Sequence, residues 1–136
     1  SAPFTEGWSF VGRSGIQHNG SAFGAPTAPE GTQTALLQSR NGEHGSFTQT
    51  LDMAAGDYTL SYQASRRPGY SAVQTVQVLV DGVVVDSFAP PTATFTAHTS
   101  ATFTVPAGDR QITFRGSAPS GDATAFVDQV VLTPVP

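Results

Sequence analysis

Residues 121–132 read Gly-Asp-Ala-Thr-Ala-Phe-Val-Asp-Gln-Val-Val-Leu, and their pattern decides the class of fold. Phe126, Val130 and Leu132 all lie at even-numbered positions, and alternate positions of a β-strand share one face. This pattern is typical of a strand with one apolar face. Asp128 has the same parity, so the pattern predicts a carboxylate on the buried face. An isolated buried charge costs too much free energy to persist. We therefore expect Asp128 to have a partner: a cation, an arginine or several backbone N–H groups.

The same alternation recurs along the rest of the chain. Residues 58–65 alternate apolar and polar side chains, which is a strong strand signal. The pair Asp81-Gly82 between two valine-rich runs is typical of a β-hairpin turn. Residues 12–31 are interrupted by Gly, Pro, Ser and Asn and predict a long loop, and residues 42–45 predict a turn. Further strands are predicted at residues 8–11, 32–38, 46–53, 73–80, 83–88, 95–105 and 111–116.

The composition agrees with one all-β domain spanning residues 1–136. Apolar residues make up 38% of the chain and charged residues 12%, and the 14 Gly and 10 Pro favour many turns and short strands. Helical periodicity is absent, so the predicted strands favour a β-sandwich or a barrel. Each strand has one apolar face and one face rich in Thr, Ser and Gln. This pattern favours a sandwich of two antiparallel sheets packed face to face.

Charge and residue usage exclude several classes of function. The net charge is −4 and lysine is absent, so the chain lacks the basic surface that nucleic-acid binding needs. Without cysteine there is no disulfide framework or thiolate metal site. No apolar run approaches the ~18 residues of a membrane span. The sequence also lacks a Gly-x-Ser-x-Gly nucleophile motif and the histidine spacing of a zinc site, so we expect no enzyme activity.

A series of short motifs resembles a known family. In chain order, the motifs include Gly20-Ser21-Ala22-Phe23, Pro29-Glu30-Gly31, Gly56-Asp57-Tyr58-Thr59, Arg67-Pro68-Gly69-Tyr70, Val80-Asp81-Gly82 and Phe126-Val127-Asp128. They resemble the galactose-binding-like jelly-roll modules attached to secreted bacterial polysaccharide-degrading enzymes, in the style of xylan- and glucan-binding carbohydrate-binding modules. The resemblance covers nearly the whole chain. It implies a jelly-roll β-sandwich, non-catalytic polysaccharide binding, an extracellular location and an appended catalytic domain.

A loop and a sheet face are the two candidate sugar sites. Arg67 and Tyr70 share one predicted loop, where binding residues concentrate, and they combine a ring for stacking with a donor for hydroxyls or a uronic-acid carboxylate. The alternative is an arginine stacked on a tyrosine in solvent. The sheet-face candidates lie on the polar parity of three strands, where they converge if those strands adjoin; the alternative is ordinary solvated surface. These candidates are Gln63, Gln77 and Arg115, joined by Gln33 and Gln38 at the two ends of another strand.

The resemblance also implies a structural calcium ion. In the family, a Glu from an opening Asn-Gly-x-Phe-Glu type motif holds the ion together with the Asp of the last strand, which Asp128 matches. This chain starts after that motif or lacks it, and Glu6 lies in a different context. Because Ca²⁺ takes six to eight oxygen ligands, a second carboxylate would have to come from Asp52, Glu6 or Asp122. The alternative is a buried aspartate that accepts backbone N–H bonds.

The sequence therefore predicts a non-catalytic carbohydrate-binding module that targets an attached glycoside hydrolase or lyase to polysaccharide. The alternative from another class is a cell-surface adhesion or structural sandwich without a sugar site. Only the fold can show which candidate side chains share a surface.

Overall fold

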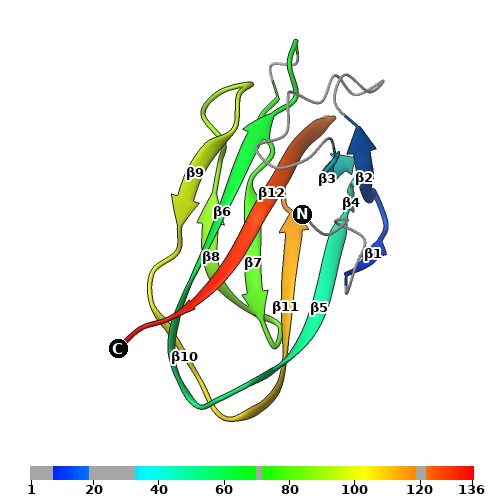
Figure 1. Cartoon of the computed structure of the whole chain (residues 1–136). Helices are drawn as coiled ribbons and strands as arrows, with labels where there is room; N and C mark the ends of the chain where they lie inside the picture. The colour runs from blue at the N-terminus through cyan, green and yellow to red at the C-terminus, as the bar shows by residue number, and fades with distance from the viewer. Residues whose placement is uncertain (1–7, 19–32, 70–71, 119–121) are drawn as a thin grey trace.

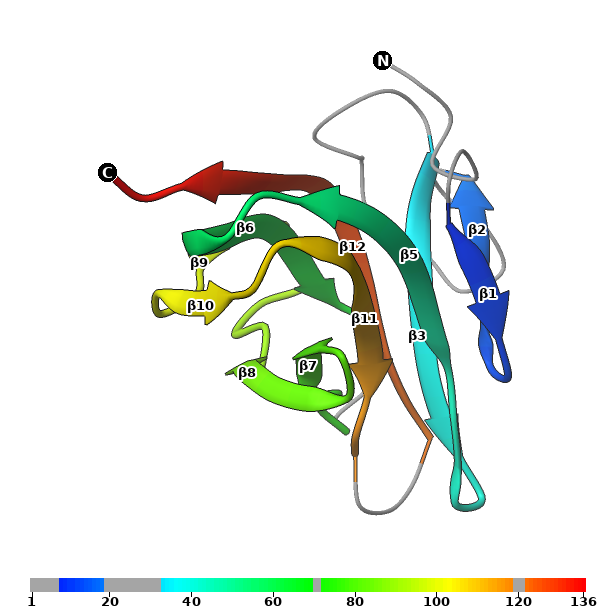
Figure 2. The ribbon, with the colours of Figure 1, turned by 90° about the horizontal axis from the view of Figure 1, so that it is seen from below.

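The computed structural model describes residues 8–18, 33–69, 72–118 and 122–136. Two antiparallel sheets pack face to face in this part of the chain (Figures 1 and 2). The five-stranded sheet has the order β1 (Ser9–Val11), β5 (Ser46–Met53), β11 (Gly108–Gly116), β7 (Val76–Val80) and β8 (Val83–Phe88). The seven-stranded sheet has the order β10 (Phe103–Val105), β6 (Gly56–Arg66), β12 (Ala123–Pro134), β3 (Gln33–Arg40) and β2 (Ser14–His18), with β9 (Thr96–Thr99) on β6 and β4 (Glu43–His44) on β3. The prediction of an all-β sandwich is confirmed. No helix in these four segments is long and apolar enough to cross a membrane.

The strand boundaries follow the sequence pattern closely, with two strands missed. The predicted strand at residues 46–53 coincides with β5, and the Asp81-Gly82 turn joins β7 to β8 with both residues at positive φ. In contrast, β2 and β4 lie where we predicted a loop and a turn. Ile16 is the only large apolar residue of β2, so this strand has no alternation to read. Its antiparallel pairing with β3, rather than its own residue pattern, makes this segment a strand.

The chain passes from one sheet to the other at two glycines. Gly12 separates β1 of the five-stranded sheet from β2 of the seven-stranded sheet, and it adopts a φ of 66°. Gly45 lies between β4 and β5, which also belong to different sheets. At Gly45 a Cβ atom would lie 1.9 Å from the backbone oxygen of Arg13. Close approach of two backbones therefore requires glycine at position 45.

Aromatic rings fill the space between the sheets. Phe47 of β5 and Phe114 of β11 stack with ring centroids 5.1 Å apart. Trp8 packs edge-on against both rings, and Tyr62 of β6 packs edge-on against Phe114 from the opposite sheet. Burial of such large apolar surfaces is the main stabilising contribution to a fold of this kind.

Gln74 fastens the two sheets together from within. Its side chain is 1% exposed and lies just before β7. The Nε2 group donates a hydrogen bond to Ser39 Oγ of β3 at 2.8 Å, and Oε1 accepts hydrogen bonds from the backbone N–H groups of Ser117 at 3.0 Å and Ala118 at 2.7 Å. A neutral side chain thus satisfies buried polar groups on both sheets.

A β-bulge divides the last strand, β12, into two halves. The pairing of β12 with β6 shifts register between Asp128 and Val131, and Gln129 has a φ of 50°. Before the bulge, Val127 points into the main core; after it, Val130 and Leu132 do so. The extra residue reverses the alternation of faces along the strand.

The bulge corrects our prediction for the face of β12. Phe126 does not share a face with Val130 and Leu132, because it packs in a separate cluster with Leu36 and Phe95. Asp128 is buried as predicted, at 5% exposure, but it lies on the same outer side of the sheet as Phe126. The rule that alternate residues share a face therefore does not hold across position 129.

Candidate functional site

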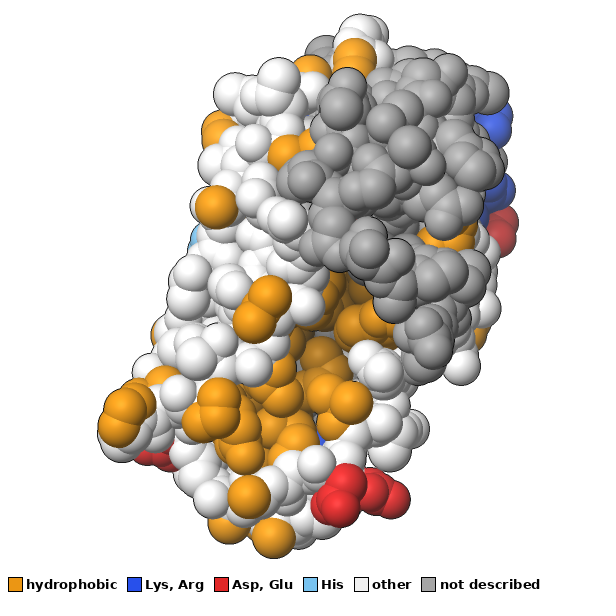
Figure 3. Space-filling model, viewed as in Figure 1, with side chains coloured by type: hydrophobic (Ala, Val, Ile, Leu, Met, Phe, Trp, Pro, Cys, Tyr) orange, Lys and Arg blue, Asp and Glu red, His pale blue; other side chains and the backbone are white. Residues whose placement is uncertain are grey.

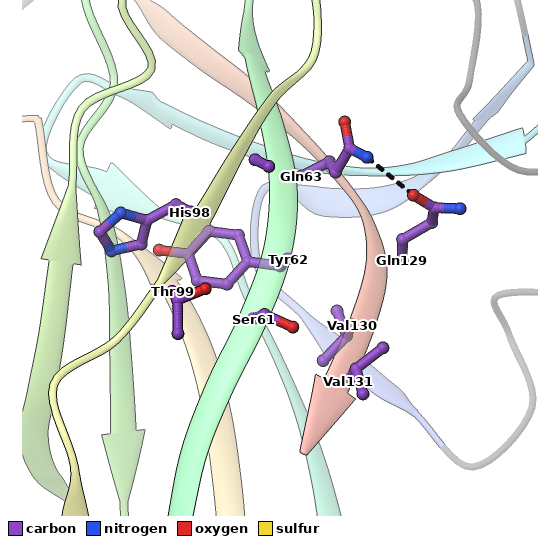
Figure 4. Close-up of a pocket in the computed structure, with 9 residues that line it drawn as sticks. Ser61, Tyr62, Gln63, His98, Thr99, Gln129, Val130 and Val131 are labelled. Atoms are coloured by element: carbon purple, nitrogen blue, oxygen red, sulfur yellow. Dashed lines mark hydrogen bonds between the residues drawn. The ribbon is translucent and has the colours of Figure 1, made fainter. Parts of the chain in front are cut away.

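An open groove of about 330 Å³ lies on the outer face of the seven-stranded sheet. Three adjacent strands, β9, β6 and β12, form its floor and walls, and Figure 4 shows the lining side chains. In register, Thr99, Ser61 and Val131 form one row across these strands. Charged side chains lie at the margin of this face of the molecule (Figure 3). The groove is lined by Ser61, Tyr62, Gln63, Ala97, His98, Thr99, Gln129, Val130 and Val131.

An amide pair lies at one end of the groove. Gln63 Nε2 of β6 donates a hydrogen bond of 2.8 Å to Gln129 Oε1 of β12. The remaining amide atoms, Gln63 Oε1 and Gln129 Nε2, point away from each other (Figure 4). Because this pair offers an acceptor and a donor beside the hydroxyls of Ser61 and Thr99, the groove suits an uncharged ligand rich in hydroxyl groups.

The groove also offers apolar surface without an aromatic platform among the described lining residues. Val131 is 52% exposed and can contact the C–H groups of a ligand. Tyr62 is only 1% exposed, so its ring faces the core and not the groove opening. Binding here would rest on hydrogen bonds and aliphatic contact rather than on ring stacking.

A hydrogen-bonded cluster behind the groove connects the two sheets. Asp86 of β8 accepts a hydrogen bond of 2.9 Å from the Tyr62 hydroxyl and one of 2.9 Å from His98 Nε2 of β9. Phe88 stacks on the His98 ring at 4.1 Å. Since β8 and β9 belong to different sheets, the cluster holds the β9 wall of the groove to the opposite sheet. Burial, followed by the Asp86 charge and its hydrogen bond, raises the pKa of Tyr62 above its usual value.

The raised pKa of Tyr62 predicts a loss of stability at high pH. An unfolded tyrosine ionises near pH 10, whereas folded Tyr62 stays neutral beyond that pH. Its contribution is therefore complete below about pH 10 and falls by up to about 1.4 kcal/mol per pH unit above it. We expect wild type to lose stability faster than Tyr62→Phe in urea unfolding between about pH 8 and about pH 11. The other tyrosines are present in both proteins, so their titration cancels in the comparison. A difference in unfolding free energy between the two proteins that stays constant with pH would therefore contradict a raised pKa of Tyr62.

The predicted sheet-face residues lie on two different sheets. Gln77 and Arg115 pair directly across β7 and β11, and Arg115 Nη2 donates a hydrogen bond of 2.6 Å to Gln77 Oε1. Gln63 lies on β6 of the other sheet, so it does not converge with them. The expectation of one face formed by all three residues is wrong, because shared polar parity does not identify the sheet to which a strand belongs.

Gln38 and Arg67, two further predicted sugar-contacting residues, do not line the groove. Gln38 is 7% exposed and donates a hydrogen bond of 2.8 Å to Asp122 Oδ1, so it ties β3 to the start of β12. Arg67 lies half-buried directly after β6. Tyr70 and the side chain of Gln33 lie outside the described residues.

The described carboxylates do not form the predicted calcium site. Asp128 accepts a hydrogen bond of 2.8 Å from the backbone N–H of Gln129. Asp52 is exposed on β5 of the opposite sheet, where it pairs in register with Asp109, so it does not supply a second ligand. No group of three potential ligands from His, Cys, Asp and Glu occurs within the segments described. Glu6 lies outside those segments.

The sequence reasoning missed most of the groove. Ser61 lies two residues before Gln63 in the alternating stretch, so the polar face of the predicted strand could have identified it. Gln129 carried no such signal, because a residue that forms a bulge cannot be recognised from alternation. His98 and Asp86 lie on separate strands, and only the packing of β8 beside β9 brings them together.

Solved structures share this fold, although no protein-family model and no curated protein matches the sequence. The C-terminal family 22 carbohydrate-binding module of a Clostridium thermocellum protein aligns over 96% of this chain and 86% of its own, at 14% identity and a TM-score of 0.68. A family 36 carbohydrate-binding module in complex with calcium and xylotriose aligns over 92% and 99%, at 18% identity and a TM-score of 0.65.

A third similar structure is an enzyme that is much longer than this chain. The exo-β-1,3-galactanase of Phanerochaete chrysosporium, in complex with β-1,3-galactotriose, aligns over 93% of this chain but only 27% of its own, at 19% identity and a TM-score of 0.64. The chain therefore has the jelly-roll β-sandwich fold of carbohydrate-binding modules, as its motifs implied.

Proposed function

We propose that the protein is a non-catalytic polysaccharide-binding module whose site is the groove between β9, β6 and β12. The observation that carries this proposal is a groove whose described lining has no Asp, Glu, Lys or Arg and offers an amide pair, two hydroxyls and an exposed valine. Its volume, about 330 Å³, lies at the lower end of the ~300–1,000 Å³ range of small-molecule pockets. A neutral sugar unit has the size and the hydroxyl groups that such a site can bind.

Similar structures support a ligand of this class. In the family 22 module, amino acids in a cleft have a role in ligand binding. The family 36 module is in complex with xylotriose. Identities of 14% and 18% do not transfer individual residues from those proteins to this one. The proposal therefore rests on the chemistry of this groove.

The described lining of the groove lacks the carboxyl groups that glycoside hydrolysis requires. Most glycosidases use two carboxyl groups about 5–9.5 Å apart on either side of the bond to be cleaved. None of the described residues that line the groove is an aspartate or glutamate. Asp86 is the nearest acid of the described cluster, and its oxygens already accept hydrogen bonds from Tyr62 and His98 behind the groove. We therefore propose binding without catalysis.

We further propose that the module belongs to a secreted enzyme and holds it on its substrate. The galactanase supports this arrangement, because this chain corresponds to about a quarter of that enzyme, at 27% of its length. Tethering raises the effective concentration of an attached catalytic domain at a polysaccharide surface without changing its active site.

Native affinity electrophoresis tests the proposal. The gels contain xylan, mixed-linkage glucan, galactan, mannan or pectin, each with calcium and with EDTA. We expect at least one neutral glycan to retard the folded protein, and the EDTA lanes show whether a calcium ion contributes. Unchanged mobility on every glycan would instead favour an adhesion or structural module.

Gln63→Ala locates the site. We expect an affinity loss of about 10-fold, because removal of the amide ends the pairing with Gln129 and takes hydrogen bonds from the ligand. Gln111→Ala is the matched control, since Gln111 is exposed on the opposite sheet. Arg67→Ala tests the loop candidate in the same gels. A loss only with Arg67→Ala would move the site from the groove to the loop.

A further inference from the structure

Gln129 has a positive φ, a backbone conformation that residues other than glycine rarely adopt. Among the described residues, positive φ at a residue other than glycine occurs at Asn41, Asp81 and Gln129. The first two precede Gly42 and Gly82 in tight turns between antiparallel strands, where this conformation is required. Gln129 lies instead inside β12, the longest of the described strands. Such a residue carries local strain, which is often found at functional sites.

The strained backbone places the Gln129 side chain in the groove. The register shift between Asp128 and Val131 places two residues of β12, Gln129 and Val130, opposite the single residue Tyr62 of β6. The Gln129 amide then reaches Gln63 and accepts the 2.8 Å hydrogen bond. Glycine would form the same bulge with less strain. The side chain at position 129 is therefore costly to the fold, and its visible use is the amide pair.

We propose that Gln63 and Gln129 together recognise two adjacent hydroxyl groups of a neutral sugar, with Gln129 as a specificity-determining residue. This inference rests on the proposed function. The mutual hydrogen bond fixes both side chains and leaves Gln63 Oε1 as an acceptor and Gln129 Nε2 as a donor (Figure 4). Adjacent hydroxyls complement this arrangement, since one can donate while the other accepts. Fixing the pair in advance lowers the entropy lost on binding.

The arrangement selects a class of polysaccharide. Internal sugars of a β-1,4-linked glucan or xylan keep the hydroxyls at C2 and C3 free and adjacent. Internal sugars of a β-1,3-linked glucan have free hydroxyls at C2 and C4, on either side of the linked oxygen. The groove should therefore bind β-1,4-linked chains in preference to β-1,3-linked chains of the same sugar. Because the amide pair is neutral, salt should have little effect on this preference.

Titration calorimetry with xylohexaose, cellohexaose and laminarihexaose tests the preference. We expect cellohexaose to bind at least about 10-fold more tightly than laminarihexaose, which differs only in linkage, because one lost hydrogen-bond pair corresponds to roughly that factor. Equal affinity for the two glucose oligomers would overturn the proposed recognition while leaving the sugar-binding function in place. Failure of all three oligosaccharides to bind would overturn both.

Variants at position 129 separate strain from recognition. We expect Gln129→Gly to raise the midpoint of urea unfolding and to weaken xylohexaose binding by about 10-fold. Gln129→Glu keeps the acceptor for Gln63 but exchanges the outward donor for an anion, so it should also lose binding while it remains folded. Asn41→Gly is the control for strain alone, because it relieves a φ of 54° in a turn outside the groove, and its binding should be unchanged. Wild-type affinity in Gln129→Gly would refute the role of Gln129.

Discussion

Gly45→Ala is expected to destabilise the protein by about 4 kcal/mol, because the added methyl group meets backbone and not a movable side chain. The new Cβ would lie 1.9 Å from the backbone oxygen of Arg13, 2.4 Å from its carbonyl carbon and 2.9 Å from the Ser14 nitrogen. Arg13 and Ser14 lie where β1 passes to β2, and Gly45 lies where β4 passes to β5, so relief of the overlap must separate these two passages between the sheets.

Gly15→Ala is the matched control for this prediction. Gly15 lies in β2, only a few residues from the same crossing, but a Cβ there would meet nothing within 4 Å. Its stability should change by less than about 1 kcal/mol. Urea unfolding followed by the fluorescence of Trp8, which packs on the core rings Phe47 and Phe114, measures both variants. Coincident unfolding curves for the two alanine variants would contradict the role of close backbone approach at Gly45.

Gln74→Leu is expected to cost about 2 kcal/mol, even though leucine is similar in size and more apolar. The substitution removes the acceptor of the buried Ala118 N–H, whereas the Ser117 N–H keeps the backbone oxygen of Thr75 and Ser39 Oγ keeps its hydrogen bond with His44 Nδ1. Each buried group left without a partner costs about 1–3 kcal/mol. A hydrophobic gain from the leucine offsets only part of this loss.

Gln111→Leu provides the comparison for Gln74→Leu, because Gln111 is exposed on β11. It should unfold near the wild-type urea concentration. Amide hydrogen exchange adds a local readout, since the N–H of Ala118 should lose protection in the Gln74 variant. Retained protection at Ala118, or a Gln74→Leu protein as stable as wild type, would show that the buried amide is dispensable.

The sequence predicted the individual strands well because alternation and turn chemistry are local properties. The regular pattern from Tyr58 to Ser65 forms the middle of β6, and the Asp81-Gly82 pair forms the turn between β7 and β8. The short strand β2 escaped prediction because its pairing with β3, rather than its own residues, defines it. Which strands share a sheet depends on long-range pairing, which parity does not encode.

The candidate site could be predicted only in part for the same reason. Gln63 was found from its polar parity, and it lines the groove. Gln77 and Arg115 have the same parity but bond to each other on the opposite sheet. Gln38 was predicted to contact the sugar from the end of a strand, but it is 7% exposed and its hydrogen bond to Asp122 ties it to the start of β12. Gln129 could not be predicted, since its importance arises from a bulge that breaks the pattern used to find the others.

The bulge in β12 has a consequence for comparing relatives of this fold. Before Gln129 the odd-numbered residue Val127 faces the core, and after Gln129 the even-numbered residue Val130 does so. A relative that lacks the extra residue would place its groove-facing and core-facing side chains one position out of step after this point. An alignment that penalises gaps inside strands would then match core residues of one protein with surface residues of the other. Comparison of such proteins should therefore be made by face of the sheet, with a one-residue gap permitted at the bulge.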